Sequence, residues 1–287
     1  MEQASIGVIG GSGLYQMPDL DDVVTVAVDT PFGAPSDELV IGSLAGKRVA
    51  FLPRHGRGHR LLPSEVPYLA NIYALRQLGV SHVISVSAVG SMREEIVPGH
   101  ICLPDQFIDL TKHRPRTFFG GGVVCHIPFD KPVCADLADV LHRAGKKAGA
   151  VMHRGGTYVC IEGPQFSTLA ESQLYRSWNV DVIGMTNLPE ARLAREAELC
   201  FATLALATDY DCWHETEEVS VEQILRIINQ NVKLAQEIIR RAVAMLPEAR
   251  GCRCGDALAH AIITDRAAIS PEARRRLDLL LGRHLAG

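Results

Sequence analysis

The sequence predicts an α/β fold, a single domain in which a central mixed, twisted sheet is flanked by helices. Short apolar, β-branched runs alternate with amphipathic stretches along residues 1–246, as expected for strands alternating with helices. No linker interrupts this alternation. The 287-residue chain is also 47% hydrophobic, and a chain of this size can bury a large core.

The order of the elements follows from hydrophobic periodicity and from capping residues. The expected strands cover residues 6–9, 48–52, 82–89, 100–103, 156–162, 180–185 and 199–209. The expected helices cover residues 64–78, 136–147, 168–178, 188–198 and 220–246. Thr168 and Ser220 each begin a capping box, Ser64 and Asn187 are expected N-caps, and Gly79 follows the end of the first helix.

The character of the chain changes after Pro247. A loop with two cysteines is followed by two short helical stretches, the last of which begins at Ser270-Pro271-Glu272. We therefore expect a domain over residues 1–250. A helical tail over residues 251–287 would pack on that domain or on a neighbouring subunit.

Composition excludes several classes of partner. The net charge of −4 and the pI near 6.3 give no general attraction to nucleic acid or to anionic membranes. Aromatic residues make up only 6%, which disfavours a base-stacking surface. No apolar run approaches the roughly 18 residues of a membrane span, and the N-terminus does not resemble a signal peptide. A cytoplasmic location is expected.

Eight cysteines are scattered along the chain. In a protein of the cytosol most should be reduced thiols that pack as small apolar side chains. Cys252 and Cys254 form a CxC pair, which by spacing alone lacks the second pair of ligands that a zinc site needs. Either two surface thiols or a disulfide or redox pair in the tail fits this pattern.

The first strand runs into a glycine-rich turn, GVIGGSGL, between Gly7 and Leu14. Glycines let backbone N–H groups approach an anion closely. The dinucleotide fingerprint fails, because Gln16 stands where its third glycine is required, and the lysine of a P-loop is missing. The turn therefore offers backbone N–H groups and the Ser12 hydroxyl to an anion, or it is a tight turn alone.

A basic turn, PRHGRGHR, follows the second strand. Arg54 supplies a planar fork for a phosphate, and His55 supplies a second donor. A solvated basic loop is the simpler interpretation. His55 and His59 are spaced four apart, but the glycines argue against the helix that a metal site would need. Arg-His-Gly after a strand also occurs in histidine phosphatases, although there it lies on the first strand.

Three further polar turns end apolar strands: VSAVGS at 86–91, GMT at 184–186 and ATDYDCW at 207–213. The carboxyl ends of strands in open α/β sheets gather ligands. We therefore expect the first two of these turns to form one oxyanion pocket with the glycine-rich turn and the basic turn. Asp209 and Asp211 end the last strand. They are either a solvated surface pair or a pair whose pKa values differ, so that one donates and one accepts.

In this order the motifs resemble the methylthioadenosine phosphorylase branch of the purine nucleoside phosphorylase family. The resemblance covers residues 5–246 and rests on IGVIGGSGL, DTPFGAPSD, RHGRGH, SAVGSMREEIVPGH, DQFIDLTKHRP, CHIPF, IEGPQFST, GMTNLPEA and ATDYDCWHE. It implies the nucleoside phosphorylase fold and a homotrimer. It implies reversible phosphorolysis of a 5′-methylthio nucleoside, with inorganic phosphate as co-substrate and with no metal or organic cofactor.

The resemblance also implies roles for individual residues. The implied phosphate-binding residues are Ser12, Arg54, His55, Ser87, Ala88 and Thr186. The implied nucleoside-binding residues are Phe166, Met185, Asp209 and Asp211, of which the two aspartates are catalytic. The implied 5′ pocket contains Ser167, Val221, Leu225 and, from a neighbouring subunit, His126. For Met185, Val221 and Leu225, ordinary core packing is the alternative.

An aspartate at position 209 implies a 6-aminopurine, because relatives that use 6-oxopurines carry asparagine there. The alternatives are a 6-oxopurine phosphorylase acting on methylthioinosine or inosine, a histidine phosphatase, and a nucleoside-binding regulator without turnover. The family departures are Ser12 in place of threonine, Gly184 in place of asparagine, Val89 in place of cysteine, and the long tail. In some thermophilic members a CxC pair near the C-terminus forms a disulfide.

Overall fold

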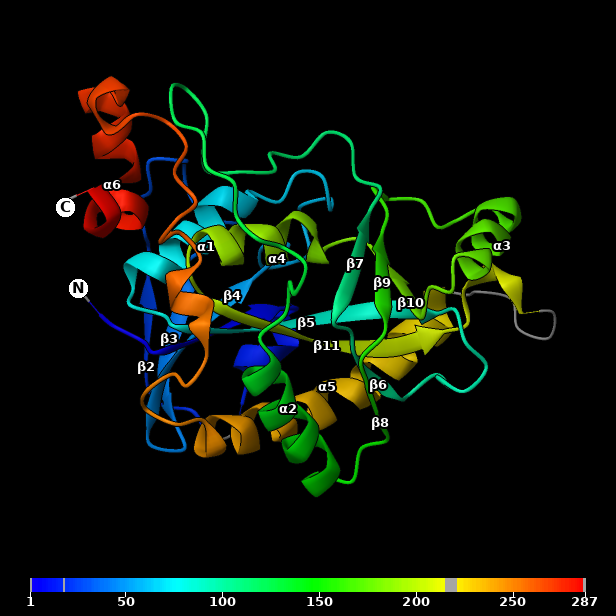
Figure 1. The fold of residues 1–287 in the computed structure, drawn as a ribbon. Helices are drawn as coiled ribbons and strands as arrows, with labels where there is room; N and C mark the ends of the chain where they lie inside the picture. Colours follow the sequence, from blue (N-terminus) through cyan, green and yellow to red (C-terminus); the bar gives the residue numbers. More distant parts are fainter. Residues whose placement is uncertain (1, 18, 215–220, 286–287) are drawn as a thin grey trace.

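The computed structural model describes residues 2–17, 19–214 and 221–285, and the side chains at 12, 15, 221–226, 228 and 229 lie outside that description. A mixed sheet forms its centre, as the sequence predicts, but it has 11 strands, of which the sequence predicted only seven (Figure 1). The strands are β1 (Ile6–Gly10), β2 (Asp21–Val26), β3 (Leu39–Leu44), β4 (Lys47–Pro53), β5 (His82–Ser91), β6 (Ile101–Leu103), β7 (Gln106–Asp109), β8 (Met152–Arg154), β9 (Thr157–Cys160), β10 (Val182–Gly184) and β11 (Cys200–Asp209). Strands β2, β3, β7 and β8 were missed.

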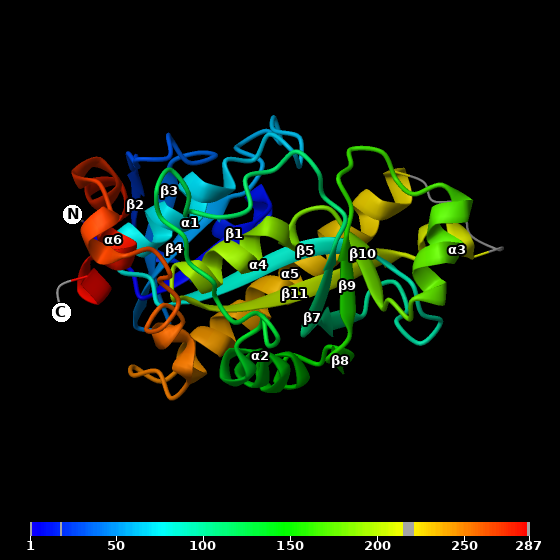
Figure 2. The same ribbon diagram turned by 45° about the horizontal axis from the view of Figure 1, so that its top comes forward.

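Helices cover both faces of the sheet (Figure 2). They are α1 (Tyr68–Gln77), α2 (Ala135–Lys147), α3 (Leu169–Ser177), α4 (Asn187–Glu196), α5 (Val221–Met245) and α6 (Pro271–Leu285). Helices α1 and α4 share one buried apolar cluster, and α2 and α5 share another. The sheet therefore lies between two apolar layers, which is the predicted α/β architecture.

Strand β5 is the branch point of the sheet. It pairs in parallel with β1 on one side and with β11 on the other, and its last residues pair antiparallel with β10. Val182 lies opposite Ser91 and Ile183 opposite Gly90, so β10 runs back along β5. This register brings the turn after β10 toward the middle of β5, where the sequence expects Ser87 to bind an anion.

Capping explains where several helices begin. The capping box at Thr168 is confirmed, because its side chain accepts from Glu171 N–H while the Glu171 carboxylate accepts from Thr168 N–H. The prediction that Asn187 caps α4 is wrong. Its side chain instead contacts Ser85 and Thr203 in the sheet. The capping box predicted at Ser220 lies outside the described residues.

Helix α1 begins at Tyr68 rather than near Ser64, so the predicted N-cap is wrong. Pro67 precedes the helix, and a proline disfavours helical backbone at the residue before it. The predicted end is confirmed. Gly79 follows Leu78 with a φ of +85°, and its N–H donates to Arg76 O.

The C-terminal segment packs against its own chain. Leu258, Leu277 and Leu281 are fully buried in the cluster that contains α1 and α4. Helix α6 has 15 residues and is longer than the short stretch that the sequence predicts. It lies beside α1 at the end of the molecule opposite α3 (Figure 1). The carboxylate of Glu198 anchors the segment, because it accepts from Leu258 N–H and pairs with Arg283 and His284.

None of the helices that the structure describes has the length and apolar character needed to cross a membrane.

Stability should fall in acid because of a buried histidine at the start of β5. Burial, with the nearby Arg250 and Lys47 charges, lowers the pKa of His82 to about 4. In the unfolded chain its pKa is about 6.5, so between these values the unfolded chain binds more protons. The stability that neutral His82 contributes is therefore complete above pH about 6.5 and is lost as the pH falls toward 4.

When the pH is lowered from about 7 to about 4.5, we expect the melting temperature of His82→Gln to fall less than that of the unmodified chain. The measurement is thermal unfolding followed by circular dichroism. Identical pH dependence in the two proteins would show that His82 carries no such effect.

Candidate active site

A buried ion pair lies at the carboxyl end of β4. Arg54 donates from Nε and Nη2 to the two carboxylate oxygens of Glu190 in α4, both at 2.9 Å. Its Nη2 also donates to Ser85 Oγ at 2.7 Å, and Nη1 donates to Val86 O at 2.8 Å. Both charged side chains are almost fully buried. The guanidinium fork that the sequence assigns to phosphate is thus turned toward a carboxylate of the protein.

The pair keeps Arg54 charged. Burial by itself would lower the pKa of Arg54, but the Glu190 carboxylate attracts the guanidinium and accepts its hydrogen bonds, so the pKa is raised. The two charges largely offset each other. In this geometry Arg54 acts first as a positioning residue for β1, β5 and α4, and its direct contact with phosphate stays a prediction.

His55 follows Arg54 and is held neutral. Burial, together with the adjacent Arg54 charge, lowers the pKa of His55 to about 4. Its Nδ1 lies 2.8 Å from Leu61 O, an acceptor, so the neutral ring carries its proton on Nδ1. Nε2 is therefore an acceptor, which fits the P–OH of monohydrogen phosphate better than a bare phosphate oxygen.

Three hydroxyl groups meet where β5, β9 and β10 converge. Ser87 Oγ lies 3.3 Å from Tyr158 Oη and 3.3 Å from Thr186 Oγ1, and all three residues are buried. The structure thus brings together two of the predicted phosphate-binding residues and adds Tyr158. Ala88, the next residue in β5, is exposed. Hydroxyls can rotate to donate to an anion, so this group can serve an oxyanion.

Gly184 makes room for this hydroxyl group. A Cβ built at Gly184 would collide with Tyr158 Oη. The backbone of Gly184 itself is ordinary β-strand, so the requirement is for space and not for a special conformation. The departure from asparagine noted in the sequence therefore has a physical reason, since any larger side chain would displace Tyr158.

The two aspartates flank Gly90 of β5. A Cβ at Gly90 would lie 3.1 Å from Asp209 Oδ1 and 3.4 Å from Asp211 Cβ. Asp209 Oδ1 accepts from the backbone N–H of Asp211 at 2.8 Å, and Asp211 Oδ2 accepts from Ser172 Oγ at 2.5 Å. Asp211 is buried and has a φ of +54°. Residues 209 and 211 are thus held by β11, a tight turn and α3.

The surroundings of Asp211 raise its pKa. Burial raises the pKa of Asp211, the nearby Asp209 carboxylate raises it further, and the hydrogen bond from Ser172 opposes both. Asp211 therefore holds a proton at higher pH than an ordinary aspartate. That the pKa values of the two carboxyls differ stays a prediction.

Ser167 lies beside the aspartate turn. Cys212 Sγ is 3.4 Å from Ser167 O, which joins the 3-10 turn η2 (Asp211–Trp213) to the segment before α3. Ser167 Oγ is buried and contacts no hydrogen-bond partner among the described residues. Phe166, its neighbour, is half exposed and does not reach the core.

The other predicted residues are placed as follows. Met185 is half-buried, and its carbonyl accepts from Arg114 Nη1 at 2.6 Å. Ser12 begins the 3-10 turn η1 (Ser12–Tyr15) after β1, and Val221 and Leu225 lie in α5, with all three side chains outside the described part. His126 is exposed, and its N–H donates to Ala261 O in the tail. Within one chain it therefore lies beside the tail.

Sequence reasoning missed the residues that support this site. Glu190 lies among apolar helix residues, and a carboxylate in such a position requires a buried partner, which was the available signal. Arg114 gave no such signal, because it lies in a loop. It is buried, pairs with Glu162 at 2.9 Å, and donates to the carbonyls of Met185 and Leu188.

Removing the Glu190 carboxylate should strongly destabilise the protein. In Glu190→Ala the buried Arg54 charge has no counterion, which costs about 3–5 kcal/mol of unfolding free energy. Glu190→Gln should cost less, because an amide oxygen still accepts. The measurement is urea denaturation. The matched control is Glu38→Ala, which removes an exposed ion pair with Arg57 and should cost about 1 kcal/mol or less. Equal losses in the two alanine variants would contradict the prediction.

The chain is similar to known proteins over nearly its whole length. The family model described as "Phosphorylase superfamily" matches residues 5–244. S-methyl-5′-thioadenosine phosphorylase of Geobacter sulfurreducens is 64% identical over 99% of this chain and 100% of its own. A methylthioadenosine phosphorylase structure from an antarctic soil metagenomic library is 51% identical, with a TM-score of 0.95, over 98% of this chain and 100% of that one. The Schistosoma mansoni methylthioadenosine phosphorylase in complex with adenine is 36% identical, with a TM-score of 0.84, over 89% and 96%. The chain therefore belongs to the phosphorylase superfamily, in its methylthioadenosine phosphorylase branch.

Proposed function

We propose that the protein catalyses the reversible phosphorolysis of S-methyl-5′-thioadenosine to adenine and 5-methylthioribose 1-phosphate. The observation that carries this proposal is the full-length similarity to methylthioadenosine phosphorylases, including 64% identity to one of them. The hydroxyl group at Ser87 and the aspartate turn beside Gly90, which both lie along β5, support it independently. Adenosine is a further substrate under this proposal.

In the proposed mechanism phosphate lies beneath the anomeric carbon of the sugar. Ser87, Thr186 and the backbone N–H of Ala88 hold it, with Ser12 and Arg54 as further donors. Neutral His55 accepts a hydrogen bond at Nε2 from the P–OH of monohydrogen phosphate, which keeps its proton. Fixing the nucleophile in this way lowers the entropic barrier, and its charge stabilises the oxocarbenium-like sugar as the glycosidic bond breaks. No metal or organic cofactor takes part.

The aspartate turn binds the departing base in this proposal. A purine anion leaves readily only when N7 receives a proton or a strong hydrogen bond. Asp209 faces the base in this proposal, and Asp211 supports it. The raised pKa of Asp211 supports a shared proton between the two carboxyls. A carboxyl pair with one proton can accept from N6 and donate to N7 of adenine, which favours 6-aminopurines.

The 5′ end of the nucleoside lies between α3 and α5 in this proposal. Ser167, Val221 and Leu225 line an apolar pocket for the methylthio group, Phe166 packs on the nucleoside, and Met185 packs on the ribose. Phe166 is half exposed in the single chain, so its ring is available to pack on a bound nucleoside. An apolar pocket discriminates a methylthio group from a hydroxyl by only about 1–3 kcal/mol, so dual use is expected.

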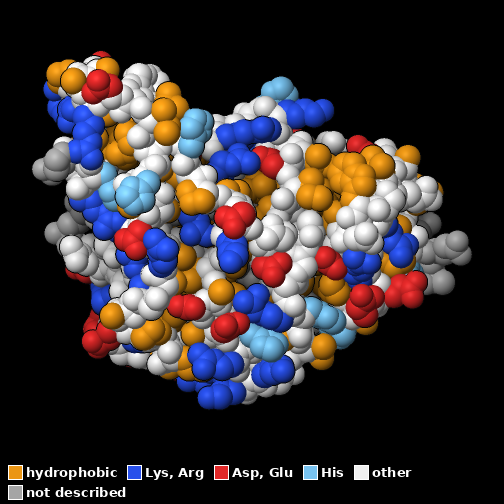
Figure 3. Space-filling view, viewed as in Figure 1, with side chains coloured by type: hydrophobic (Ala, Val, Ile, Leu, Met, Phe, Trp, Pro, Cys, Tyr) orange, Lys and Arg blue, Asp and Glu red, His pale blue; other side chains and the backbone are white. Residues whose placement is uncertain are grey.

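We also propose a cytoplasmic homotrimer in which His126 of a neighbouring subunit reaches the 5′ pocket. Phe166, Leu169 and Leu174 expose apolar side chains on and before α3, which supports burial against a partner. Apolar side chains also gather in a patch on the face shown in Figure 3. Residues 251–287 serve as an appendage of the domain over 1–250.

The reaction is tested by following adenine release from S-methyl-5′-thioadenosine with and without inorganic phosphate. Release that requires phosphate is the expected result, and 5-methylthioribose 1-phosphate should form in equal amount. Adenosine and methylthioinosine are measured in parallel. Release from methylthioinosine alone would replace the proposal with a 6-oxopurine phosphorylase, and binding without release would indicate a regulator.

The base assignment is tested by Asp209→Asn. An amide donates to O6 of a 6-oxopurine, whereas a carboxylate is repelled by it, so the ratio of kcat/KM for methylthioadenosine over methylthioinosine should fall by about tenfold or more, which is about 1.4 kcal/mol. Asp211→Asn is the matched comparison and should lower kcat with a smaller change in this ratio. An unchanged ratio in Asp209→Asn would remove Asp209 from base recognition.

A further inference from the structure

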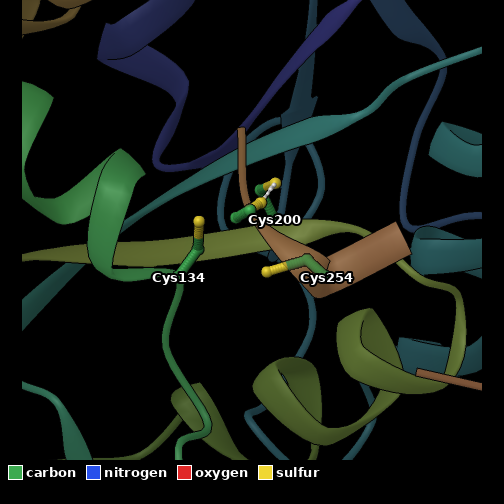
Figure 4. A group of neighbouring side chains, drawn as sticks. Cys134, Cys200 and Cys254 are labelled. Atoms are coloured by element: carbon green, nitrogen blue, oxygen red, sulfur yellow. Dashed lines mark hydrogen bonds between the residues drawn. The ribbon is translucent and has the colours of Figure 1, made fainter. Parts of the chain in front are cut away.

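Four of the eight cysteines meet at one point, outside the site described above. They are Cys134 before α2, Cys200 at the start of β11, and Cys252 and Cys254 in the tail. All four Sγ atoms lie within 4.8 Å of one another. Cys134, Cys200 and Cys254 are buried and Cys252 is half-buried. Figure 4 shows the labelled side chains converging from three different elements.

Two hydrogen bonds hold the segments that carry these cysteines close together. The N–H of Cys134 donates to Phe201 O at 2.9 Å, which fixes the start of α2 beside the start of β11. Arg250 Nη1 donates to Glu198 O at 2.7 Å, which fixes the tail beside the same strand. Sequence spacing could not predict this cluster, because Cys134 and Cys200 lie far from the CxC pair along the chain and reach it only in the folded structure.

The spacing of the sulfurs fits a tetrahedral metal site. With metal–sulfur bonds of about 2.3 Å, a tetrahedral zinc site has sulfur–sulfur edges of about 3.8 Å. The Cys200–Cys252 sulfur pair is 3.2 Å apart, and every pair lies within 4.8 Å, so these distances bracket the ideal edge. Four thiolates complete the coordination and leave no position for substrate, which is typical of a structural site. Magnesium and calcium prefer oxygen ligands and do not fit.

The surroundings favour thiolates. Cys134 is the N-cap of α2, and the positive end of a helix dipole stabilises a negative sulfur. Arg195 Nη1 donates to Cys254 Sγ at 3.9 Å, a contact of the kind that neutralises and orients metal-bound thiolates. Apolar residues of α2, α5 and β11 surround the group and keep water away.

We propose that Cys134, Cys200, Cys252 and Cys254 bind one structural zinc ion. The ion ties the C-terminal tail to β11 and to the start of α2. The binding free energy therefore adds to the stability of the folded chain. The role is separate from phosphorolysis, which proceeds at the other end of β11.

The full-length chain is purified without chelator, and its metal content is measured by mass spectrometry. We expect about one zinc per chain, and all eight cysteines should react as free thiols after denaturation with chelator. Disulfides among the four cysteines, found by peptide mapping, would overturn the proposal. A zinc content below about a tenth per chain would do the same, as would iron in place of zinc.

A double variant tests whether these cysteines bind the zinc ion. Cys252→Ser with Cys254→Ser should lose zinc, and chelator should no longer lower its melting temperature. Cys125→Ser is the matched control, because Cys125 is half-buried and lies outside the group, and it should retain zinc. Zinc retained in the double variant would overturn the assignment.

If the double variant does not fold, cobalt is bound to the unmodified chain after zinc removal. Strong visible absorption with thiolate charge transfer indicates four-coordinate cobalt–thiolate bonding and supports the proposal. Weak octahedral absorption overturns it.

Discussion

The ion pair between Arg54 and Glu190 is the interaction on which the site depends. A buried guanidinium without a partner would be prohibitively costly, so the chain must bring β4 and α4 to one place. The same guanidinium binds Ser85 and the carbonyl of Val86, which fixes the path of β5 beside it. The geometry around the proposed phosphate site thus follows from satisfying one charge.

The two sides of the site differ in how firmly they are held. On the proposed phosphate side, side chains come from the central strands and are buried and close to one another, as for Ser87, Tyr158 and Thr186. On the proposed nucleoside side, Phe166 lies half exposed in the single chain. The proposed anion site is thus built from the core of the sheet, whereas Phe166 lies at the surface.

The sequence predicted the elements that carry strong local signals. Strand β1 and the capping box at Thr168 are correct because apolar runs and caps are encoded by neighbouring residues. Contacts between residues far apart in the sequence could not be predicted. Asn187 was assigned to a helix end but serves the sheet, Glu190 was not recognised as the counterion of Arg54, and Cys134 was not connected with the tail. In each case the missing information was which two distant segments come together.

The lack of space at Gly184 couples two positions of this chain. A side chain at 184 and the Tyr158 hydroxyl would occupy the same volume, so neither position can change independently of the other. A larger residue at 184 therefore requires a smaller or redirected side chain at 158, and the hydroxyl that Tyr158 contributes beside Ser87 would be lost or moved.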